Sequence, residues 1–344
     1  MAQTHSHQAD MVCLASVSVG YRRQPVLSDV SVCADRGELV ALVGRNGMGK
    51  STLMRTIARL QPKLSGDVLL CGKPVEGYSR NRLSGTLSIV STEIVSVSHL
   101  TVKQLVSFGR FPHTNWIGRL TADDMALVEE AIQLTGIASI GNKKLYQTSD
   151  GERQRAMIAR TLAQDTPVIL LDEPTAFLDM AGKYETVRLL GQLTRRKHKT
   201  IIFSTHDLNI AMQEADKLWL ITDNGMCEGA PEDMALDNRL DRLFENSSLH
   251  FDGTSGTFGI RRSHASTIYL RGKEKYLFWT QKALERIGYE VVFHHGHPED
   301  AMSVSVALQG QGDPFPCWTL QRNGQELRFN SILSLCRHLR DICT

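Results

Sequence analysis

The sequence predicts an α/β domain built on a largely parallel β-sheet, followed by a small α+β domain. Three observations lead to this prediction. Short apolar runs alternate with amphipathic stretches through about the first two thirds of the chain, a pattern typical of parallel sheets covered by helices. Residues 245–259 are rich in Ser, Gly and Thr, as in a linker between domains. The length of 344 residues suits two domains better than one.

The bulk composition excludes several classes of protein. With 42% hydrophobic residues the chain can bury a large core, and its formal net charge of +2 gives no general attraction to nucleic acid or anionic membranes. Apolar runs such as Leu218–Ile221 are far shorter than the roughly 20 residues that a membrane span needs. The polar segment Met1–Asp10 lacks the basic start and apolar centre of a signal peptide. Any role at a membrane is therefore expected to require a partner protein.

The cysteines predict neither a zinc site nor a redox motif. They are scattered, and none forms a C-x-x-C pair. We therefore expect separate, mostly buried thiols in a reducing compartment.

Three buried strands are predicted at Leu39–Val43, Val168–Leu171 and Thr200–Phe203, each ending where polar residues begin. Because ligands of open α/β sheets bind outside the carboxyl ends of the strands, we expect the three polar clusters to converge. Between Leu218 and Pro231, an apolar run, an Asn-Gly dipeptide and a second extended piece predict a hairpin.

The loop after Leu39–Val43 has the glycine spacing of a phosphate-binding loop. Glycines let backbone N–H groups turn inward around an anion, and the N-terminus of the next helix adds its positive end. The ammonium group of Lys50 suits the β- and γ-phosphates of ATP, and the hydroxyl group of Ser51 suits Mg²⁺. The predicted ATP-binding residues of this segment are Gly44, Arg45, Asn46, Gly47, Met48, Gly49, Lys50, Ser51 and Thr52.

Two carboxylates follow the strand Val168–Leu171. At the end of a buried strand, Asp172 and Glu173 lose hydration, which is unfavourable unless a cation or phosphate chemistry compensates. Downstream of a phosphate-binding loop, this pair predicts Asp172 as a Mg²⁺ ligand and Glu173 as the catalytic base that activates the attacking water. A helix cap is the alternative role of such a pair.

A third motif begins at Thr148 and continues through Ser149, Asp150, Gly151 and Glu152. Together with the preceding motifs it resembles the signature of ABC ATPases, and the resemblance covers about Met11–Leu243. It implies an α/β P-loop NTPase of the ABC ATPase type, with a mixed β-sheet core and a helical signature subdomain. It further implies that Ser149, Gly151 and Glu152 contact the ATP held by a second copy, so that a homodimer encloses two ATP molecules.

The same resemblance assigns three further residues. Tyr21 corresponds to the aromatic residue that stacks on adenine, and Asp179 lies in the loop that crosses the dimer interface. His206 corresponds to the histidine that contacts the γ-phosphate, so the implied catalytic group is Lys50, Glu173 and His206.

The chain departs from the family pattern at two positions. Thr92 stands where the family has a glutamine that helps to hold Mg²⁺, so either Thr92 takes that role or the adjacent Glu93 does. Asp150 replaces a glycine and places a carboxylate near a phosphate unless it points away or caps the helix. We expect Asp150 to cap the helix.

The segment around Gly109, Arg110, Pro112 and His113 is similar to that of importers of iron–siderophore complexes, haem and vitamin B12. This similarity implies an ATPase on the cytoplasmic face of the plasma membrane, held there by integral-membrane permease subunits and served indirectly by a substrate-binding protein. The alternatives are an ABC ATPase of another import or export system, a non-transport ABC ATPase, and a catalytically weak binding module. Non-transport relatives carry long coiled coils or two nucleotide domains, whereas this chain has no sustained heptads and one P-loop motif.

The expected domains are the ATPase domain at 11–244, the linker at 245–259 and an accessory domain at 260–344. In the last, strands are predicted near Thr267–Leu270, Glu290–Phe293 and Ser303–Ala307, with helices over Tyr276–Ile287 and after Asn330. A dimer-stabilising or regulatory role is a hypothesis for this domain. Its loop with His294, His295, His297 and Asp300 is either a metal site or, as we favour, an ordinary solvated loop.

Overall fold

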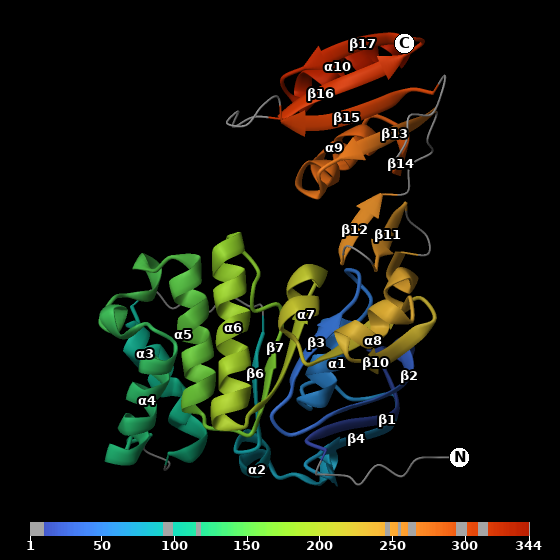
Figure 1. Ribbon diagram of the computed structural model, residues 1–344. Coiled ribbons are helices and arrows are strands. Elements are labelled where there is room, and N and C mark those ends of the chain that lie inside the picture. Colours follow the sequence, from blue (N-terminus) through green and yellow to red (C-terminus); the bar gives the residue numbers. More distant parts are fainter. Residues whose placement is uncertain are drawn as a thin grey trace. The chain divides into compact units, whose positions relative to one another are not determined.

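The computed structural model describes residues 10–91, 99–114, 118–244, 248–253, 256–260, 266–293, 301–308 and 316–343 (Figure 1). The chain divides into two compact units. The first consists of Met1–Glu245 and Phe251–Thr257, and the second of Asn246–His250 and Phe258–Thr344. Each unit has its own β-structure, with two sheets in the first unit and one five-stranded sheet in the second, and its own cluster of buried apolar side chains.

The first unit contains two sheets. One has the strand order β10-β9-β3-β8-β7-β6, in which all neighbours are parallel except the edge strand β10, and the other is antiparallel with the order β2-β1-β4-β5. Its strands are β1 (Val12–Tyr21), β2 (Gln24–Ala34), β3 (Leu39–Val43), β4 (Ser65–Leu70), β5 (Lys73–Pro74), β6 (Leu87–Val90), β7 (Val168–Leu171), β8 (Thr200–Thr205), β9 (Lys217–Thr222) and β10 (Gly225–Gly229).

The three predicted strands are neighbours in the parallel sheet, as β3-β8-β7. Every residue of these strands is buried, because helices or the second sheet cover both faces. The carboxyl ends of parallel neighbours meet at one edge of the sheet, so the polar residues that follow them come together there. The predicted hairpin is also confirmed, with β9 and β10 joined by a turn at residues 223–224.

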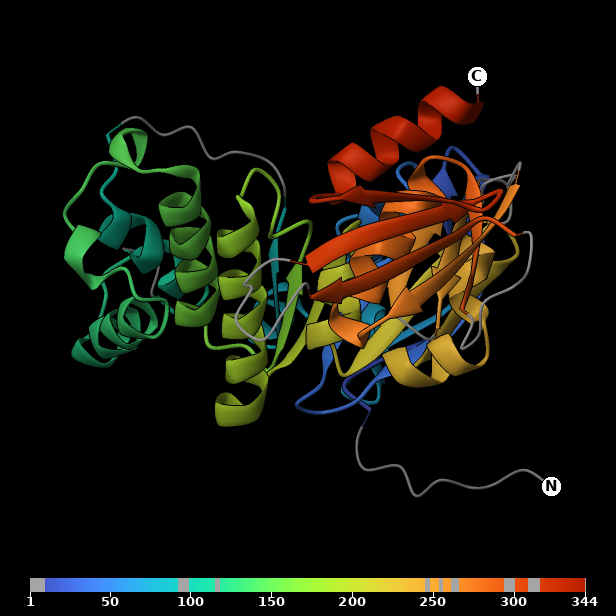
Figure 2. The same cartoon turned by 45° about the horizontal axis from the view of Figure 1, so that its top comes forward.

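The helices of the first unit cover the parallel sheet and form a group beside it. Leu53, Met54 and Ile57 of α1 belong to the apolar core that both sheets share. The helices α3, α4 and α5 pack on one another. Figure 2 shows this group at one side of the parallel sheet, with α6 between the group and the sheet. The helices are α1 (Lys50–Ile57), α2 (Arg80–Ser84), α3 (Val102–Ser107), α4 (Ala122–Leu134), α5 (Asp150–Ala163), α6 (Met180–Lys197), α7 (Leu208–Glu214), α8 (Pro231–Leu236) and the short 3₁₀ helices η1 (Val75–Gly77), η2 (Phe108–His113), η3 (Ala138–Ile140), η4 (Leu145–Gln147) and η5 (Arg239–Phe244).

The segment 245–259, for which the composition predicts a linker, contains paired strands. β11 (Leu249–Asp252) and β12 (Thr257–Ile260) form a two-stranded sheet. A run of Ser, Gly and Thr predicts turns, and the pairing of the two short strands on either side of such a turn was not predicted.

The second unit is a five-stranded mixed sheet with two helices. The strand order is β14-β13-β15-β16-β17, with β13 parallel to both of its neighbours and β16 antiparallel to both of its own. Its elements are β13 (Ser266–Gly272), α9 (Glu274–Arg286), β14 (Tyr289–Phe293), β15 (Ser303–Leu308), β16 (Pro316–Arg322), β17 (Gln325–Phe329) and α10 (Ile332–Cys343).

The elements predicted for this unit are all present, but the prediction omitted the β16–β17 hairpin. Its turn consists of Asn323 and Gly324, whose φ angles of 51° and 74° are both left-handed. An Asn-Gly pair between two extended runs is a strong local signal for such a turn, so this hairpin was predictable from the sequence.

The expectation of separate thiols is wrong for one pair. Cys13 and Cys33 lie directly opposite each other on β1 and β2 and form a disulfide, while the other cysteines whose side chains are described, Cys71, Cys227, Cys317 and Cys336, are free. Local spacing could not reveal this pair, because 20 residues and a hairpin turn separate its members.

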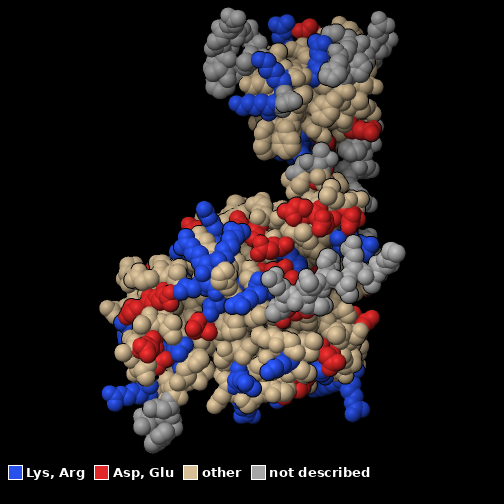
Figure 3. Space-filling model, turned by 60° about the horizontal axis from the view of Figure 1, so that its bottom comes forward, with Lys and Arg blue, Asp and Glu red and all other residues tan. Residues whose placement is uncertain are grey.

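The surface carries both signs of charge. Figure 3 shows groups of basic side chains beside groups of acidic ones on one face of the first unit, in keeping with the small net charge of +2. Among the described residues, no helix combines the length and apolar character that crossing a bilayer requires.

Candidate nucleotide-binding and hydrolysis site

The glycine-rich loop connects the central strand β3 to α1 and has the backbone that a phosphate-binding loop needs. Gly47 and Gly49 have φ angles of 84° and 97°, and a Cβ atom at Gly49 would lie 2.9 Å from Cγ1 of Val26. These positions therefore require glycine. Gly49 is the N-cap of α1 and makes no side-chain cap, so the first N–H groups of the helix are not capped by this residue. Such an N-terminus fits a phosphate group.

Lys50 lies over this loop. It is only 6% exposed, and its Nζ donates hydrogen bonds to the carbonyl oxygens of Gly44 at 2.8 Å and Arg45 at 3.3 Å. Burial lowers the pKa of Lys50 below its usual value, and the charges of Glu173 and Asp172 partly oppose this effect. A buried ammonium group facing two carboxylates fits the phosphate and metal chemistry predicted from the motif.

The carboxylate pair does not cap a helix, so the alternative role is wrong. Asp172 is 7% exposed, and its Oδ1 accepts a hydrogen bond of 2.7 Å from the hydroxyl group of Ser204. The same hydroxyl oxygen accepts the backbone N–H of Glu173 at 2.8 Å. Glu173 has a left-handed φ of 47°, which turns the chain sharply after the strand. Ser204 on β8 thus orients both members of the pair.

Sequence reasoning missed Ser204. It is the residue before Thr205 and His206 at the end of β8, and it is fully buried. The sequence offered one signal, a serine inside an otherwise apolar strand. Its role follows only from the tertiary structure, in which β8 lies beside β7 and Ser204 reaches the two carboxylates.

His206 lies beside the predicted catalytic base. Its Nδ1 is 3.9 Å from Oε1 of Glu173, and its side chain is 54% exposed. The residue follows β8, and Asp207 next to it caps α7 by accepting the N–H of Ile210. The fold therefore brings Lys50, Asp172, Glu173 and His206 to one edge of the sheet.

Tyr21 ends β1 next to α1. Its hydroxyl group shares a hydrogen bond of 3.1 Å with the hydroxyl group of Thr52, and 57% of the residue is exposed. An exposed ring beside the N-terminal turn of α1 offers a face for a flat, apolar ligand group.

The remaining loop residues lie around the same turn. Arg45 is 3.7 Å from Asp223, Met48 packs on the core, and Ser51 is exposed in the first turn of α1. Ser51 and Asp172 offer hydroxyl and carboxylate oxygens, which are the ligands that Mg²⁺ prefers.

The signature motif starts α5, and one prediction about it is wrong. Ser149, and not Asp150, caps the helix, because its hydroxyl group accepts the N–H of Glu152 while the Glu152 carboxylate accepts the N–H of Ser149. This reciprocal arrangement leaves Asp150 in the first turn, where its carboxylate lies 3.7 Å from Arg153. Lys143 donates to Glu152 at 2.8 Å and, with the Ser149 N–H, lowers the pKa of Glu152.

The signature residues line a cavity of about 570 Å³ together with the loop that follows β7. Asp179 contributes to the cavity and also caps α6, since its Oδ1 accepts the N–H of Gly182 at 2.8 Å. The lining includes Ser149, Gly151 and Glu152 but none of the glycine-rich loop residues 44–51. The two predicted halves of the ATP site therefore do not share this cavity.

The segment 109–113, whose sequence is similar to that of metal-chelate importers, has a structural role in this chain. Arg110 is buried and donates to Asp124 of α4 at 2.9 Å and to the carbonyl oxygen of Ala163 of α5 at 2.8 Å. His113 hydrogen-bonds the carbonyl oxygen of Gln164 at 2.9 Å. A Cβ atom at Gly109 would lie 2.1 Å from the Arg160 carbonyl oxygen, so only glycine fits. These contacts attach η2 to α4 and to the end of α5.

Several predicted residues lie outside the described part of the chain. They are Thr92, Glu93, His294, His295, His297 and Asp300. β6, which leads toward Thr92, ends at Val90 on the edge next to β7.

Comparison with known proteins gives consistent results. A family described as “ABC transporter” matches residues 27–176, and one described as “Iron ABC transporter C-terminal domain” matches residues 265–340. The chain is 39% identical over 219 residues to the achromobactin transport ATP-binding protein CbrD of Dickeya dadantii, covering 63% of this chain and 81% of that protein. It is 36% identical over 244 residues to the probable siderophore transport system ATP-binding protein YusV of Bacillus subtilis, covering 70% and 89%.

Solved structures show the same fold. CbiO1 of Clostridium perfringens, part of the ABC transporter complex cbiONQ, is 29% identical with a TM-score of 0.60, covering 68% of this chain and 94% of that chain. The dimeric bacterial ABC transporter cassette MJ0796 is 24% identical with a TM-score of 0.56, covering 64% and 99%. The chain thus belongs to the ATP-binding proteins of the ABC transporter family, which are ATPases.

Proposed function

We propose that this chain is the ATP-hydrolysing subunit of an ABC importer whose cargo is an iron–siderophore complex or a related haem or cobalamin-type metal chelate. One observation carries the hydrolytic part. Lys50, the adjacent pair Asp172 and Glu173, and His206 come from three separate segments, and the order β3-β8-β7 brings them to one edge of the sheet. The family match at residues 265–340 and the transport systems named for the two relatives support the cargo class.

In this proposal the chain's own groups divide the work of phosphoryl transfer. Backbone N–H groups of the loop and the Lys50 ammonium group hold the β- and γ-phosphates, and Tyr21 stacks on the adenine. Glu173 accepts a proton from the attacking water, and His206 donates a hydrogen bond to the γ-phosphate. Mg²⁺ held by Ser51 and Asp172, with Thr92 or Glu93 as a further ligand, would neutralise phosphate charge.

The dimer is part of the same proposal. Ser149, Gly151 and Glu152 stand at the N-terminus of α5, where the N–H of Gly151, which the Ser149–Glu152 cap does not use, can meet the γ-phosphate of ATP bound to a second copy. The cavity that these residues line contains no residue of the loop 44–51, which supports an ATP site that two chains complete. Permease subunits then place this homodimer at the cytoplasmic face of the plasma membrane, and a substrate-binding protein delivers the cargo.

Replacing Glu173 by Gln tests the hydrolytic role. The variant should bind ATP but hydrolyse it at least about a hundredfold more slowly, because a general base typically contributes 10²–10⁴-fold. ATP should then trap a dimer that size-exclusion chromatography detects. Lys50→Ala is the matched comparison, which should lose both hydrolysis and the ATP-dependent dimer. A Glu173→Gln variant with the normal Mg²⁺-dependent rate would refute the assignment of the base.

The cargo class is tested by uptake in cells. Cells that lack this chain should lose uptake of a radiolabelled ferric siderophore, haem or cobalamin, and the wild-type chain should restore it while Lys50→Ala should not. If uptake of all three cargoes is unchanged, the cargo proposal is wrong, although the ATPase assignment would stand.

A further inference from the structure

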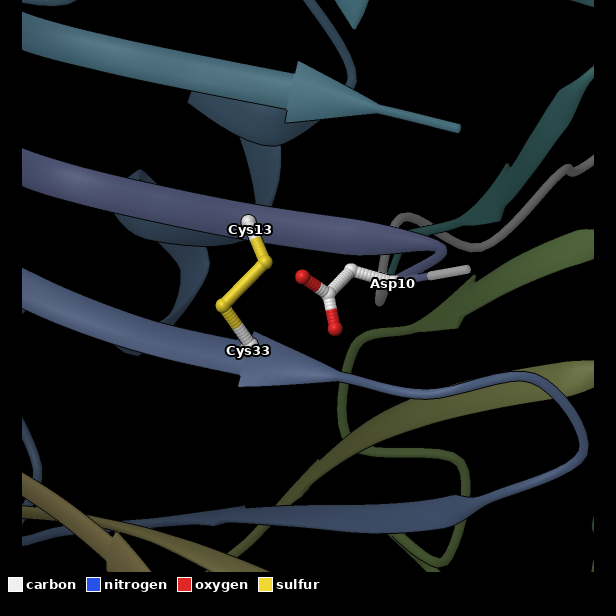
Figure 4. Close-up of side chains that lie close together, drawn as sticks. All are labelled: Asp10, Cys13 and Cys33. Atoms are coloured by element: carbon white, nitrogen blue, oxygen red, sulfur yellow. A yellow bond between two sulfur atoms is a disulfide. The ribbon is translucent and has the colours of Figure 1, made fainter. Parts of the chain in front are cut away.

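The disulfide at the open end of the β1–β2 hairpin has a carboxylate beside it. Figure 4 shows the side chain of Asp10, which precedes β1, turned toward the sulfur atoms of Cys13 and Cys33. One ligand atom from each of these residues lies within 4.8 Å of the other two. Once the disulfide is reduced, two sulfur atoms and a carboxylate oxygen form a donor set that the ATPase chemistry does not use.

The geometry of the strands suits metal ligation as well as disulfide formation. Cys13 and Cys33 are direct partners in the antiparallel register, with Cα atoms 4.2 Å apart, so both side chains project from the same face of the sheet. In a tetrahedral site with Zn–S bonds of about 2.3 Å, two sulfur ligands are roughly 3.8 Å apart. When the disulfide is opened, small rotations of the side chains suffice to reach this separation.

The charges around Cys33 favour a cation. The Glu228 carboxylate accepts the N–H of Cys33 at 2.9 Å. Lys217 donates to the carbonyl oxygen of Cys33 at 3.1 Å, but it lies 2.9 Å from Glu38 and 3.6 Å from Asp35. These contacts therefore include three carboxylates, those of Glu228, Glu38 and Asp35, and one ammonium group, that of Lys217.

Solvent can reach the site from outside. Asp10 and Cys33 are partly exposed, whereas Cys13 is 8% exposed. A metal ion, a peroxide or a small thiol can therefore approach without unfolding of the sheet.

We propose that, in the reduced protein, Sγ of Cys13, Sγ of Cys33 and a carboxylate oxygen of Asp10 bind a thiophilic divalent cation such as Zn²⁺. Water takes the fourth position, as in zinc sites with three protein ligands. Binding releases the two thiol protons. A hydroperoxide oxidises the free dithiol to the disulfide, taking up two electrons and two protons and leaving as an alcohol and water. The disulfide is the form that cannot hold the cation, so oxidation and binding exclude each other.

Cobalt(II) titration of the full chain tests this proposal, because thiolate ligands give Co²⁺ a charge-transfer absorption that imidazole does not. This distinction matters since His5 and His7 lie near the N-terminus. The chain is first reduced, then separated from the reductant under anaerobic conditions, and finally titrated with Co²⁺. The expected result is a thiolate band that saturates at about one Co²⁺ per chain, disappears when Zn²⁺ is added, and is absent after treatment with hydrogen peroxide.

The variants assign the ligands. Cys13→Ser and Cys33→Ser should abolish the charge-transfer band or weaken Co²⁺ binding at least about tenfold, and Asp10→Asn should weaken binding by a similar factor while keeping the band. Cys71→Ser is the matched control, because this free, exposed cysteine lies beside the start of β1, where its N–H bonds the carbonyl oxygen of Met11 at 2.8 Å. It should bind Co²⁺ like the wild type.

Three outcomes would overturn the proposal: no thiolate band in the reduced wild-type chain, an unchanged band in the Cys13→Ser/Cys33→Ser double variant, or equal thiolate binding before and after peroxide treatment. The comparison of reduced with oxidised wild type needs no substitution, so it remains decisive if a cysteine variant fails to fold. In addition, Zn²⁺ should protect Cys13 and Cys33, but not Cys71, from alkylation measured by mass spectrometry.

Discussion

At the scale of single residues, the hydroxyl group of Ser204 organises the end of β7. It donates to Asp172 and accepts from the N–H of Glu173, so one buried side chain holds the proposed magnesium ligand and the proposed base in a common orientation. A hydrogen bond to a charged group is typically worth about 1.5–3 kcal/mol, and its loss in a buried place leaves the partner unsatisfied. Ser204 is a positioning residue, since it acts through these two groups.

Replacing Ser204 by Ala should therefore weaken the site while the fold persists. We expect the Mg²⁺ concentration for half-maximal ATPase rate to rise and kcat to fall roughly tenfold, because about 1.4 kcal/mol corresponds to a factor of ten. Steady-state assays across Mg²⁺ concentrations measure both effects. Ser84→Ala removes an exposed hydroxyl group that bonds the carbonyl oxygen of Asn81 and is the control. An unchanged Mg²⁺ dependence in Ser204→Ala would show that the Asp172 carboxylate needs no such support.

At the scale of elements, the contacts of η2 with α4 and the end of α5 hold the helical group together. Arg110 and Asp124 are both buried, and each has further partners. Arg110 donates to the end of α5, and the Asp124 carboxylate accepts the N–H and the hydroxyl group of Thr121, which caps α4. Hydrogen bonds from the backbone and hydroxyl group of Thr121, together with Arg110, lower the pKa of Asp124 from 3.8 to about 2.

Removing one member of this pair should be costly. Arg110→Met is expected to lower the free energy of unfolding by about 3–5 kcal/mol, because it leaves a buried carboxylate without its cation. The pair Arg153–Asp150, of which Asp150 is exposed and Arg153 partly exposed, provides the comparison, and Arg153→Met should change stability by no more than about 1 kcal/mol. Urea unfolding followed by far-UV circular dichroism measures both. Equal effects of the two substitutions would contradict the role of the Arg110–Asp124 pair.

The same pair predicts a pH dependence. A carboxyl group with a lower pKa in the folded state stabilises the protein fully above its unfolded pKa, near 3.8, and this contribution is lost as the pH falls toward about 2. The wild type should therefore lose stability over this window more steeply than Asp124→Asn, which has no proton to gain. Urea midpoints measured from pH 5 down to the acid limit of folding test this difference. Parallel curves for the two proteins would exclude it.

At the scale of the whole molecule, each unit has a core of its own. The core of the first unit lies between its two sheets and contains Trp219, whereas that of the second contains Trp318 and no residue of the first. Trp318 also donates to Thr280 of α9 at 2.8 Å. Separate cores predict separate unfolding transitions.

Calorimetry of the full chain should resolve two unfolding transitions. ATP with Mg²⁺ should raise the midpoint temperature of the transition that belongs to the first unit and leave the other unchanged. A ligand at a hundred times its Kd stabilises the unit that binds it by about 2.7 kcal/mol. Lys50→Ala should abolish the shift without changing the other transition. A single transition that ATP shifts as a whole would show that the units unfold together.

Much of the candidate site could be predicted because its residues lie in short sequence motifs. One continuous loop contains Gly44, Gly49, Lys50 and Ser51, so their spacing can be recognised locally. Asp172 and Glu173 directly follow an apolar run that predicts a buried strand. The β16–β17 hairpin had an equally local signal in Asn323 and Gly324, and its omission was an error of interpretation. The cap of α5 was also a local matter, since a serine followed three residues later by a glutamate is the usual capping pair.

The sequence by itself determined the fold class, and its motifs and family resemblance predicted the phosphate-binding loop and the proposed catalytic groups. Only the tertiary structure decided that Ser204 supports Asp172, that Arg110 joins α4 to α5, and that Cys13 meets Cys33 beside Asp10. The physical reason is the range of the interaction. Glycine geometry and strand periodicity act between near neighbours, whereas these contacts depend on strand order and helix packing, which are set by burial of the whole core.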